Sequence, residues 1–522
     1  MPDPSRERGV ALLAAVLVLA IALMAALTAA IARSATGPRR DAASDRALAL
    51  AREALIAHAA SRPIDEIVGP GYLPCPDLDD DGWAEPTCGS MTGETGQWQR
   101  LGRLPWKTLG LPDLRDAHGE RLWYAVSSKY KGLLNCTVSP ACLDMSPEAA
   151  LGTITVRDPA GTVVNDGTAP GPYEPGKGGA VAVVFAPGPA IARWTGNGAP
   201  PVLQVRTCDG GTCSPAGRCL SEPPTLTPKC NPANYLDRSP GPAYADEDNA
   251  RFVDRNDAAG RPANRDGFIQ GPVSDRDGNV WVNDRLAVLS YDDVMPRVMR
   301  RVATEVASCL REYAARSENA GRLPWAAPLC RSHNASLRWK ESSGSLFGRV
   351  PDTPFLAAAG DSGSAMLANW APGCRIANAQ GGTASVGGFT WWSAWKRHVF
   401  YSVAAASRPA PGAAGSCDSL TCLYISADSG GGAPAGHRFA VLVAGPPLLF
   451  DSGRQSRGAA SDSDAAQWLE GANADLRRLN ANPAAPGCAA DATYPVGAAS
   501  PAFNRIATLA APGMNDVVVA GP

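Results

Sequence analysis

The chain has 522 residues, with 48 Lys and Arg against 50 Asp and Glu. This near-neutral balance excludes a basic nucleic-acid-binding surface or an acidic disordered tail as the organising feature. Apolar residues make up 45% of the sequence, enough for packed cores, while 54 Gly and 46 Pro favour short strands and long loops over a helical bundle.

The N-terminus is polar up to Gly9 and then strongly apolar. From Val10 to Ala32 there are 23 residues without a charge, which is long enough to span a bilayer as a helix. A cleaved secretory signal has an apolar region of about 7–15 residues, so a retained signal anchor fits this length better. The small residues near Ala29 leave a secretory cleavage site open as an alternative.

The segment Arg8-Gly9-Val10-Ala11-Leu12-Leu13 resembles the N-terminus of type IV pilins and type II secretion pseudopilins, in which a polar leader ending in Gly precedes an unbroken apolar helix. The resemblance implies cleavage by a prepilin peptidase between Gly9 and Val10, followed by methylation of Val10. It implies a single-pass inner-membrane protein whose soluble part lies in the periplasm or on an extracellular filament. Its partners would be other pilin or pseudopilin subunits.

Two positions depart from the family pattern. The first mature residue is usually Phe and here is Val10, and the fifth is usually Glu and here is Ala14. In the family this Glu neutralises the N-terminal amine of a neighbouring subunit, and a buried charge without such pairing is costly. A tip subunit has no neighbour above it, and the largest pseudopilin of type II secretion, which caps the tip, similarly lacks the Glu. We therefore expect a minor or tip subunit.

Two amphipathic helices are predicted in the soluble part. The first covers Asp41–Ser61, after a kink at Gly37-Pro38, and Pro63 ends it. The second covers residues 297–316 and carries one apolar stripe. The stripe of the first helix contains Leu48, Ala51, Leu55 and Ala59, and that of the second contains Val298, Val302, Val306, Cys309, Leu310 and Tyr313. Each helix is expected to cover a sheet.

Several sequence blocks recur in the same order in the two halves of the chain. The pairs are Gly71–Cys75 with Gly321–Trp325, Leu122–Ser127 with Val399–Ala404, Cys136 and Cys142 with Cys417 and Cys422, Ala180–Pro189 with Phe439–Pro447, and Asn283–Leu289 with Phe503–Leu509. The apolar segments 180–186 and 439–444 are predicted central strands. The spacing between blocks differs, which indicates a divergent duplication.

The predicted fold class is therefore α+β. An N-terminal transmembrane helix extends into an amphipathic helix, and two duplicated pilin-like modules follow, each a helix packed on an antiparallel sheet with long disulfide-stapled loops. The predicted domains are a leader at 1–9, a transmembrane helix and kink at 10–40, a first module at 41–295 with a Cys-, Pro- and Gly-rich insertion at 206–280, and a second module at 296–522.

The 14 Cys favour disulfides in an oxidising compartment, because most of them fall in close pairs. Zinc is the weaker alternative, since no Cys-x2-Cys knuckle occurs and the five His are scattered. The predicted pairs are Cys75/Cys88, Cys136/Cys142, Cys208/Cys213, Cys219/Cys230, Cys309/Cys330, Cys417/Cys422 and, at longer range, Cys374/Cys488.

One segment has the pattern of a calcium-binding loop. Asp77, Asp79 and Asp81 alternate before Gly82, and alternate carboxylates in a tight turn can converge on a hard cation. The twelfth position is Cys88 instead of the bidentate Glu of a full EF-hand. Calcium is thus the one cofactor the sequence suggests, and a solvated acidic turn is the alternative. The turn at Asp275-Arg276-Asp277-Gly278 is a weaker match.

Other motifs do not support an enzyme. Gly171–Gly178 approaches a P-loop, but its prolines remove backbone donors and the final Ser or Thr is missing. Ser362 lies in a Gly-Asp-Ser-Gly segment without a suitable upstream His context. We therefore expect no catalytic residues and no nucleic-acid partner. The alternative function is a signal-anchored periplasmic or surface binding protein outside any filament, with the Trp-rich segment 391–395 as either a binding surface or core.

Overall fold

We describe the chain from a computed structural model. The structure describes residues 41–65, 68–89, 97–131, 144–167, 176, 178–195, 200–206, 230–240, 247–252, 267–329, 339, 341, 345–352, 370–371, 374–376, 390–409, 414–416, 422–426, 436–447, 449–450, 453–457, 462, 464–469, 505–507 and 517–521. The predicted cleavage site at Gly9 and Val10 and the apolar stretch at 10–32 lie outside these residues. Within the described stretches, no helix combines the length and the apolar character needed to cross a membrane.

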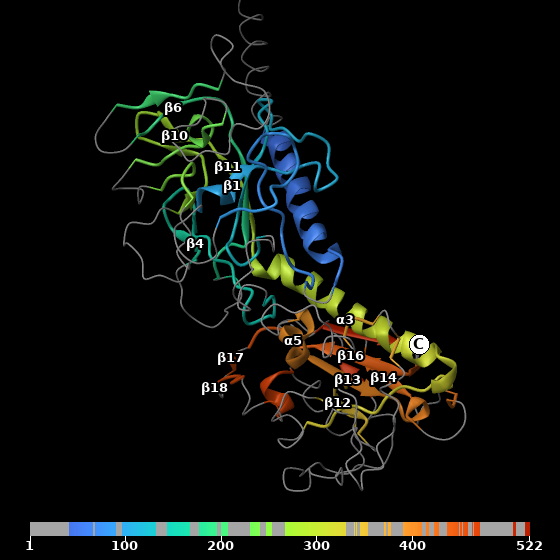
Figure 1. The fold of residues 1–522 in the computed structure, drawn as a ribbon. Helices are drawn as coiled ribbons and strands as arrows, with labels where there is room; N and C mark the ends of the chain where they lie inside the picture. The colour runs from blue at the N-terminus through green and yellow to red at the C-terminus, as the bar shows by residue number, and fades with distance from the viewer. Residues whose placement is uncertain are drawn as a thin grey trace, which may run out of the picture.

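The first half of the chain forms a helix packed beside an antiparallel sheet, which we call the N-terminal unit (Figure 1). The strands of the sheet lie in the order β1 (Leu101–Arg103), β2 (Trp123–Val126), β5 (Ala182–Ala186) and β11 (Arg285–Leu289). Helix 41–61 lies next to β11, since Arg52 donates to the Val288 carbonyl and Arg285 pairs with Asp41. The predicted apolar stripe of this helix is buried, which confirms the helix and its face.

The second half repeats this layout in what we call the C-terminal unit. Its helix is α3 (Tyr291–Ala315), which contacts the sheet at its two last strands. The strands lie in the order β12 (Phe347–Arg349), β13 (Val399–Val403), β16 (Phe439–Val443) and β20 (Val517–Gly521), all antiparallel. Helix α3 begins six residues before the predicted start at 297, because Ser290 and Asp293 form a capping box there.

The two units share one hydrophobic core and are stacked along α3 (Figure 1). Gly69 of the N-terminal unit packs against Trp391, which belongs to the short helix α5 (Trp391–Trp395) of the C-terminal unit. Glu148 forms an ion pair with Arg457 across the junction, at 3.4 Å. Because β11 ends at residue 289 and α3 begins at 291, the chain passes between the units with a single intervening residue.

A smaller three-stranded sheet accompanies each large one, and both have one antiparallel and one parallel pair. The first has the order β4 (Val163–Asn165), β3 (Val156–Arg157), β8 (Phe268–Ile269), and the second β15 (Gly436–His437), β14 (Leu423–Ser426), β19 (Arg505–Ala507). The expected match of 503–509 with 283–289 is therefore wrong: β20 occupies the edge position equivalent to β11, while β19 is equivalent to β8. Short apolar runs fit either edge, so a likeness over seven residues cannot fix the pairing.

Three further strand pairs complete the described structure: β6 (Ala192–Arg193) with β7 (Val202–Leu203), β9 (Val273–Ser274) with β10 (Val280–Val282), and β17 (Leu449–Phe450) with β18 (Gly453–Arg454). The predicted insertion at 206–280 thus contributes short strands. It also contributes Tyr235, Leu236 and Phe252 to a second core on the outer face of the N-terminal sheet. The described parts of this segment are integral to the fold of the unit.

Equivalent side chains tie down both sheets. The hydroxyl of Tyr124 on β2 donates to the Pro74 carbonyl at 3.1 Å, and the hydroxyl of Tyr401 on β13 donates to the Pro324 carbonyl at 3.0 Å. These two prolines belong to the sequence blocks that recur at 71–75 and 321–325. The recurrence therefore places the same hydrogen bond on the same strand of each sheet.

An arginine clamp in the N-terminal unit holds the segment that follows β5. Arg206 donates to the carbonyls of Gly188, Asn234 and Tyr235 at 2.6, 2.8 and 3.2 Å, and to Gln204 Oε1 at 2.9 Å. Its guanidinium also lies 5.2 Å from the centre of the Tyr235 ring. The planar fork of Arg suits several fixed acceptors at once, which a Lys side chain could not satisfy.

The C-terminal unit has the same clamp after β16. Arg457 donates to the carbonyls of Gly445, Gln467 and Trp468 at 2.5, 3.0 and 3.1 Å, and to Gln455 Oε1 at 3.0 Å. Its guanidinium lies 5.1 Å from the Trp468 ring. Each of these hydrogen bonds, and the contact with an aromatic ring, has a counterpart in the clamp of Arg206.

The disulfides confirm one predicted pair and overturn others. Cys75–Cys88 forms as predicted. Cys309 on the buried face of α3 bonds to Cys374, so the predicted pairs Cys309/Cys330 and Cys374/Cys488 are wrong. This bond joins residues 65 positions apart, whereas the prediction paired cysteines that are close in the sequence.

The remaining cysteines are described in part. Cys230 and Cys422 are also disulfide-bonded. The other predicted cysteines lie outside the described residues: Cys136, Cys142, Cys208, Cys213, Cys219, Cys330, Cys417 and Cys488.

Candidate functional site

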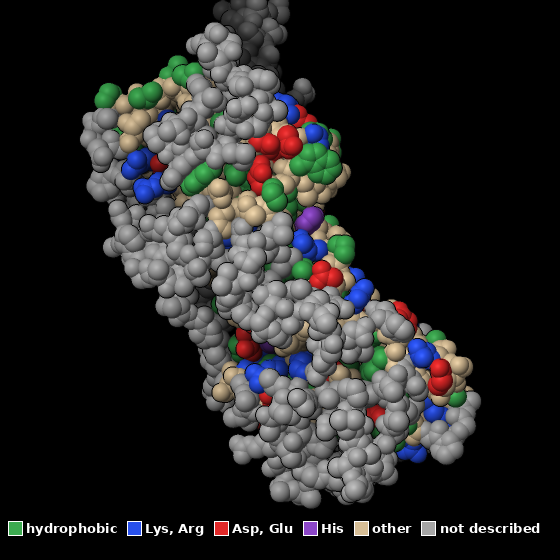
Figure 2. Space-filling view, in the orientation of Figure 1, with side chains coloured by type: hydrophobic (Ala, Val, Ile, Leu, Met, Phe, Trp, Pro, Cys, Tyr) green, Lys and Arg blue, Asp and Glu red, His purple; other side chains and the backbone are tan. Residues whose placement is uncertain are grey.

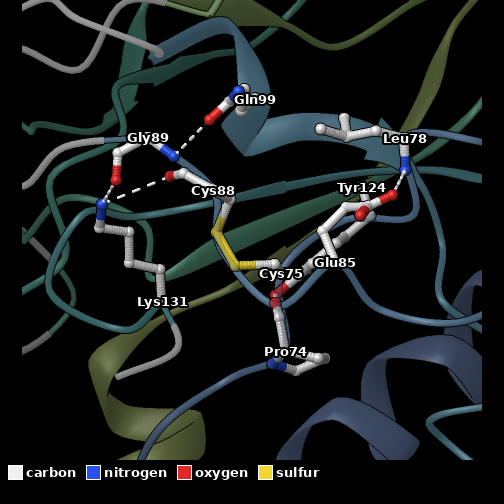
Figure 3. Close-up of a disulfide and its surroundings, with 9 residues drawn as sticks. All are labelled: Pro74, Cys75, Leu78, Glu85, Cys88, Gly89, Gln99, Tyr124 and Lys131. Carbon is white, nitrogen blue, oxygen red and sulfur yellow. Dashed lines mark hydrogen bonds between the residues drawn. A yellow bond between two sulfur atoms is a disulfide. The ribbon is translucent and has the colours of Figure 1, made fainter. Parts of the chain in front are cut away.

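The candidate site is the acidic loop at residues 77–85, which the first disulfide encloses (Figure 3). At its start Asp77 exchanges backbone hydrogen bonds with Arg103 at the end of β1. At its far side the Cys88 and Gly89 carbonyls accept hydrogen bonds from Lys131, and the Gly89 N–H donates to Gln99. One end of the loop is therefore fixed to the sheet and the other to residues that flank its strands.

The turn itself requires glycine at one position. Gly82 has a φ of +91°, which L-residues rarely adopt, and a Cβ there would lie 2.7 Å from the Trp106 ring. Its N–H donates to Asp77 Oδ2 at 2.7 Å. The sequence pattern thus predicts correctly that this glycine allows a tight bend next to the acidic residues.

Three carboxylates converge inside the loop. One oxygen each from Asp77, Asp79 and Glu85 lies within 4.8 Å of the other two. Asp77 is buried, and Glu85 Oε1 accepts a hydrogen bond from the Leu78 N–H at 3.2 Å. Oxygen donors at this spacing suit a hard cation such as Ca²⁺, to which they would contribute three of its six to eight ligands.

The converging set differs from the predicted one in one member. Asp81 was expected to join Asp77 and Asp79, but its carboxylate accepts the Trp83 N–H at 2.7 Å and is not among the three converging groups. Glu85 contributes instead. It stands at the ninth position counted from Asp77, a position that often supplies a calcium ligand, so the sequence did contain the signal for it.

The electrostatics of the loop leave its carboxylates short of positive charge. Burial, together with the neighbouring Asp80 and Asp81, raises the pKa of Asp77 to about 7, against the hydrogen bond from Gly82. Burial also raises the pKa of Glu85. The guanidinium of Arg121, which contacts the loop, is engaged by Asp80 at 2.6 Å. A bound cation would therefore favour the ionised form of Asp77, because an opposite charge lowers a carboxyl pKa.

Two other predicted sites have structural explanations. The carboxylate of Asp275 accepts the N–H groups of Asp277 and Asn279 in the exposed turn between β9 and β10, so this acidic pair shapes a turn. Trp391, Trp392 and Trp395 are all buried in the main core, which makes packing their role and removes them as a binding surface. Ser362 and most of Gly171–Gly178 lie outside the described residues.

The chain matches no protein-family model, no curated protein and no solved structure.

Proposed function

We propose that the chain is a membrane-anchored minor pilin or pseudopilin-like subunit with a structural or assembly role at the tip of a type IV pilus or type II secretion filament. One observation carries this proposal. A leader ending in Gly9 and an uncharged stretch of 23 residues lead into helix 41–61, which lies on an antiparallel sheet. This is the order of elements that the family resemblance implies.

The second unit supports the proposed duplication of a pilin-like module. Both sheets have the same strand order, and each carries a helix beside its last strand. The tyrosine bonds to Pro74 and Pro324 and the clamps of Arg206 and Arg457 recur at matching places. Independent origin would have to produce each of these matches separately, so a common ancestral module is the simpler account.

A tip position is favoured over the filament shaft by Ala14. A shaft subunit needs a carboxylate near this point to neutralise the N-terminal amine of its neighbour in an apolar core. Ala14 offers none, whereas a subunit at the tip has no such neighbour to serve.

The test is the N-terminus of the mature protein, measured by mass spectrometry on membranes from a host that has a prepilin peptidase. We expect a chain that begins at methylated Val10. Gly9→Val should leave the leader attached, whereas the matched variant Val10→Phe, which restores the usual family residue, should be cleaved like the wild type.

A wild-type chain that begins at Met1, or one cut near Ala30, would refute the pilin-like proposal. It would favour the alternative of a signal-anchored periplasmic or surface binding protein with no role in a filament. That alternative also predicts that the protein works after its anchor is replaced by an unrelated one, which a filament subunit would not tolerate.

A further inference from the structure

The end of the N-terminal unit where helix 41–61 begins carries exposed apolar side chains. Leu203 and Val202 on β7 are 64% and 59% exposed, and Val205 and Val280 are exposed beside them. Figure 2 shows apolar side chains gathered over this end of the molecule, at the upper left. We call Val202, Leu203, Val205 and Val280, together with Trp194 and Trp281, the end patch.

The strands of the end patch belong together. β10 lies against β6, and the rings of Trp194 and Trp281 meet edge to face with their centres 5.7 Å apart. Exposed Val and Leu flanked by Trp is the composition of protein surfaces at the membrane–water interface, where indole rings prefer the headgroup region.

Hydrogen bonds and an ion pair place the end patch next to the start of helix 41–61. β10 ends at Val282, and Arg285, three residues later, forms an ion pair with Asp41 at 2.7 Å. The side chain of Asn283, between them, donates to the Pro189 carbonyl just ahead of β6. Figure 1 shows β6 and β10 at the same end of the molecule as the start of this helix.

The short connection before helix 41–61 limits how far this end of the N-terminal unit can lie from the membrane. Eight residues, 33–40, separate the apolar stretch at 10–32 from Asp41. Fully extended, this connection spans about 30 Å. A unit tethered to a bilayer by residues 10–32 therefore keeps its helix start, and with it the end patch, within reach of the lipid surface.

We propose that the end patch docks the N-terminal unit on the lipid bilayer that holds residues 10–32, with Leu203 and Val202 inserted at the interface. This inference rests on the proposed membrane anchor. The inference goes beyond the anchor, because residues 33–40 would also allow an anchored unit to stand away from the bilayer without contacting it. Docking fixes the orientation of the unit before assembly.

The test uses the full chain in vesicles of phosphatidylcholine and phosphatidylglycerol whose acyl chains carry bromine, which quenches Trp on contact. The first Trp of the sequence is Trp83, so residues 1–40 add no signal. Trp83, which is exposed on the acidic loop, is replaced by Phe in every protein used. We expect quenching relative to unbrominated vesicles, and Trp194→Phe with Trp281→Phe should reduce it by about half or more.

A matched pair of variants locates the contact. Val202→Asp with Leu203→Asp should abolish most of the quenching. Val163→Asp with Val164→Asp should leave it unchanged, although these β4 valines are also exposed. They are far from the end patch, since β4 is followed at once by Asp166, which bridges Gly178, and Gly176 bonds Asp292 at the start of α3. All four sites are exposed, so both variants should unfold at the wild-type temperature.

Flotation of the same vesicles separates the two proposals. Protein that floats without quenching, or with quenching that the Val202→Asp, Leu203→Asp variant does not change, refutes docking and leaves the anchor intact. Protein that fails to float refutes the anchor and the docking with it. Floating protein without quenching that cross-links into dimers, lost in the same variant, would assign the end patch to a second copy of the chain and overturn the lipid contact.

Discussion

The two units share a helix and a four-stranded sheet but differ in the loops attached to them. Asp77 exchanges backbone hydrogen bonds with Arg103 at the end of β1, and Ala327 does the same with Arg349 at the end of β12. Beyond this shared bridge the N-terminal unit forms the acidic loop, whereas the C-terminal unit has Ala327 in the place of the buried carboxylate. The backbone pairing with the edge strand is common to both units, whereas the loop that follows this pairing differs between them.

The disulfides differ in the same way. Cys75–Cys88 closes a loop within the N-terminal unit, while Cys309–Cys374 ties α3 to a distant segment of the C-terminal unit. The first therefore closes a single loop, whereas the second links two segments that are far apart in the sequence. Four measurements test this difference between the units.

The largest effect should come from the C-terminal disulfide. Replacing Cys309 and Cys374 with Ser should lower the free energy of unfolding by about 4 kcal/mol, against about 3 kcal/mol for Cys75 and Cys88, because the longer loop restrains the unfolded chain more. The closed loops span 65 and 13 residues. Chemical denaturation of both double variants measures the difference, and equal losses would contradict the assigned roles.

Loss of a clamp comes next. Arg457→Ala should lower the free energy of unfolding by about 3 kcal/mol, because four acceptors lose a charged donor in the interior. Arg457→Lys should recover little of it, since an ammonium group cannot reach all four. If the clamps are equivalent, Arg206→Ala should cost about as much, and a loss under about 1 kcal/mol would show that they are not.

The pH dependence of stability should be marked in the N-terminal unit. The pKa of Asp77 is raised from 3.8 to about 7 in the folded chain, so between these values the folded state holds a proton that the unfolded state releases. Stability therefore falls as pH rises from about 4 to about 7, by about 2 kcal/mol in total, which is below the upper limit of about 4 kcal/mol that a slope of about 1.4 kcal/mol per pH unit gives over this range.

Asp77→Asn isolates this contribution. Thermal unfolding of the variant across that pH range should show a flatter profile than the wild type. Asp275→Asn, in an exposed acidic turn, serves as the matched control and should keep the wild-type slope. An unchanged slope in Asp77→Asn would mean that the carboxyl titrates normally in the folded chain.

Calcium should have the smallest effect and bears on the predicted ligand set. At millimolar Ca²⁺ the free energy of unfolding should rise by about 1 kcal/mol, as expected for a weak extracellular site, and chelation should reverse the rise. Glu85→Gln should abolish this response and Asp81→Asn should keep most of it. The opposite pattern would favour the three aspartates chosen from the sequence alone, and no response in the wild type would leave a solvated turn.

Most helices and central strands of the two units were predictable, because the spacing of apolar residues along the sequence indicates which side chains are buried. The stripes of helix 41–61 and α3, and the strands β5 and β16, follow from apolar spacing that only one face or a central strand can satisfy. The bond Cys75–Cys88 followed from its short separation. These features depend on residues that are near one another in the chain.

The features that escaped prediction depend on residues far apart in sequence. Cys309–Cys374 forms because folding places Cys374 against α3, and the clamp of Arg457 recognises backbone carbonyls, which leave no sequence signature. β20 was missed as the strand equivalent to β11 because another apolar segment, 503–509, resembled β11 more closely in sequence. Glu85 was missed because the prediction rested on the alternating aspartates and on the twelfth loop position alone, although the ninth position carries a carboxylate.

The single residue between β11 and α3 has a mechanical consequence. Ser290 leaves no slack for a hinge, and its capping box with Asp293 stiffens the joint on the helix side. Glu148 and Arg457 brace the same joint from the other side. The short connection, the capping box and the ion pair therefore restrain how the two units are oriented, so a displacement of one unit is expected to carry the other with it.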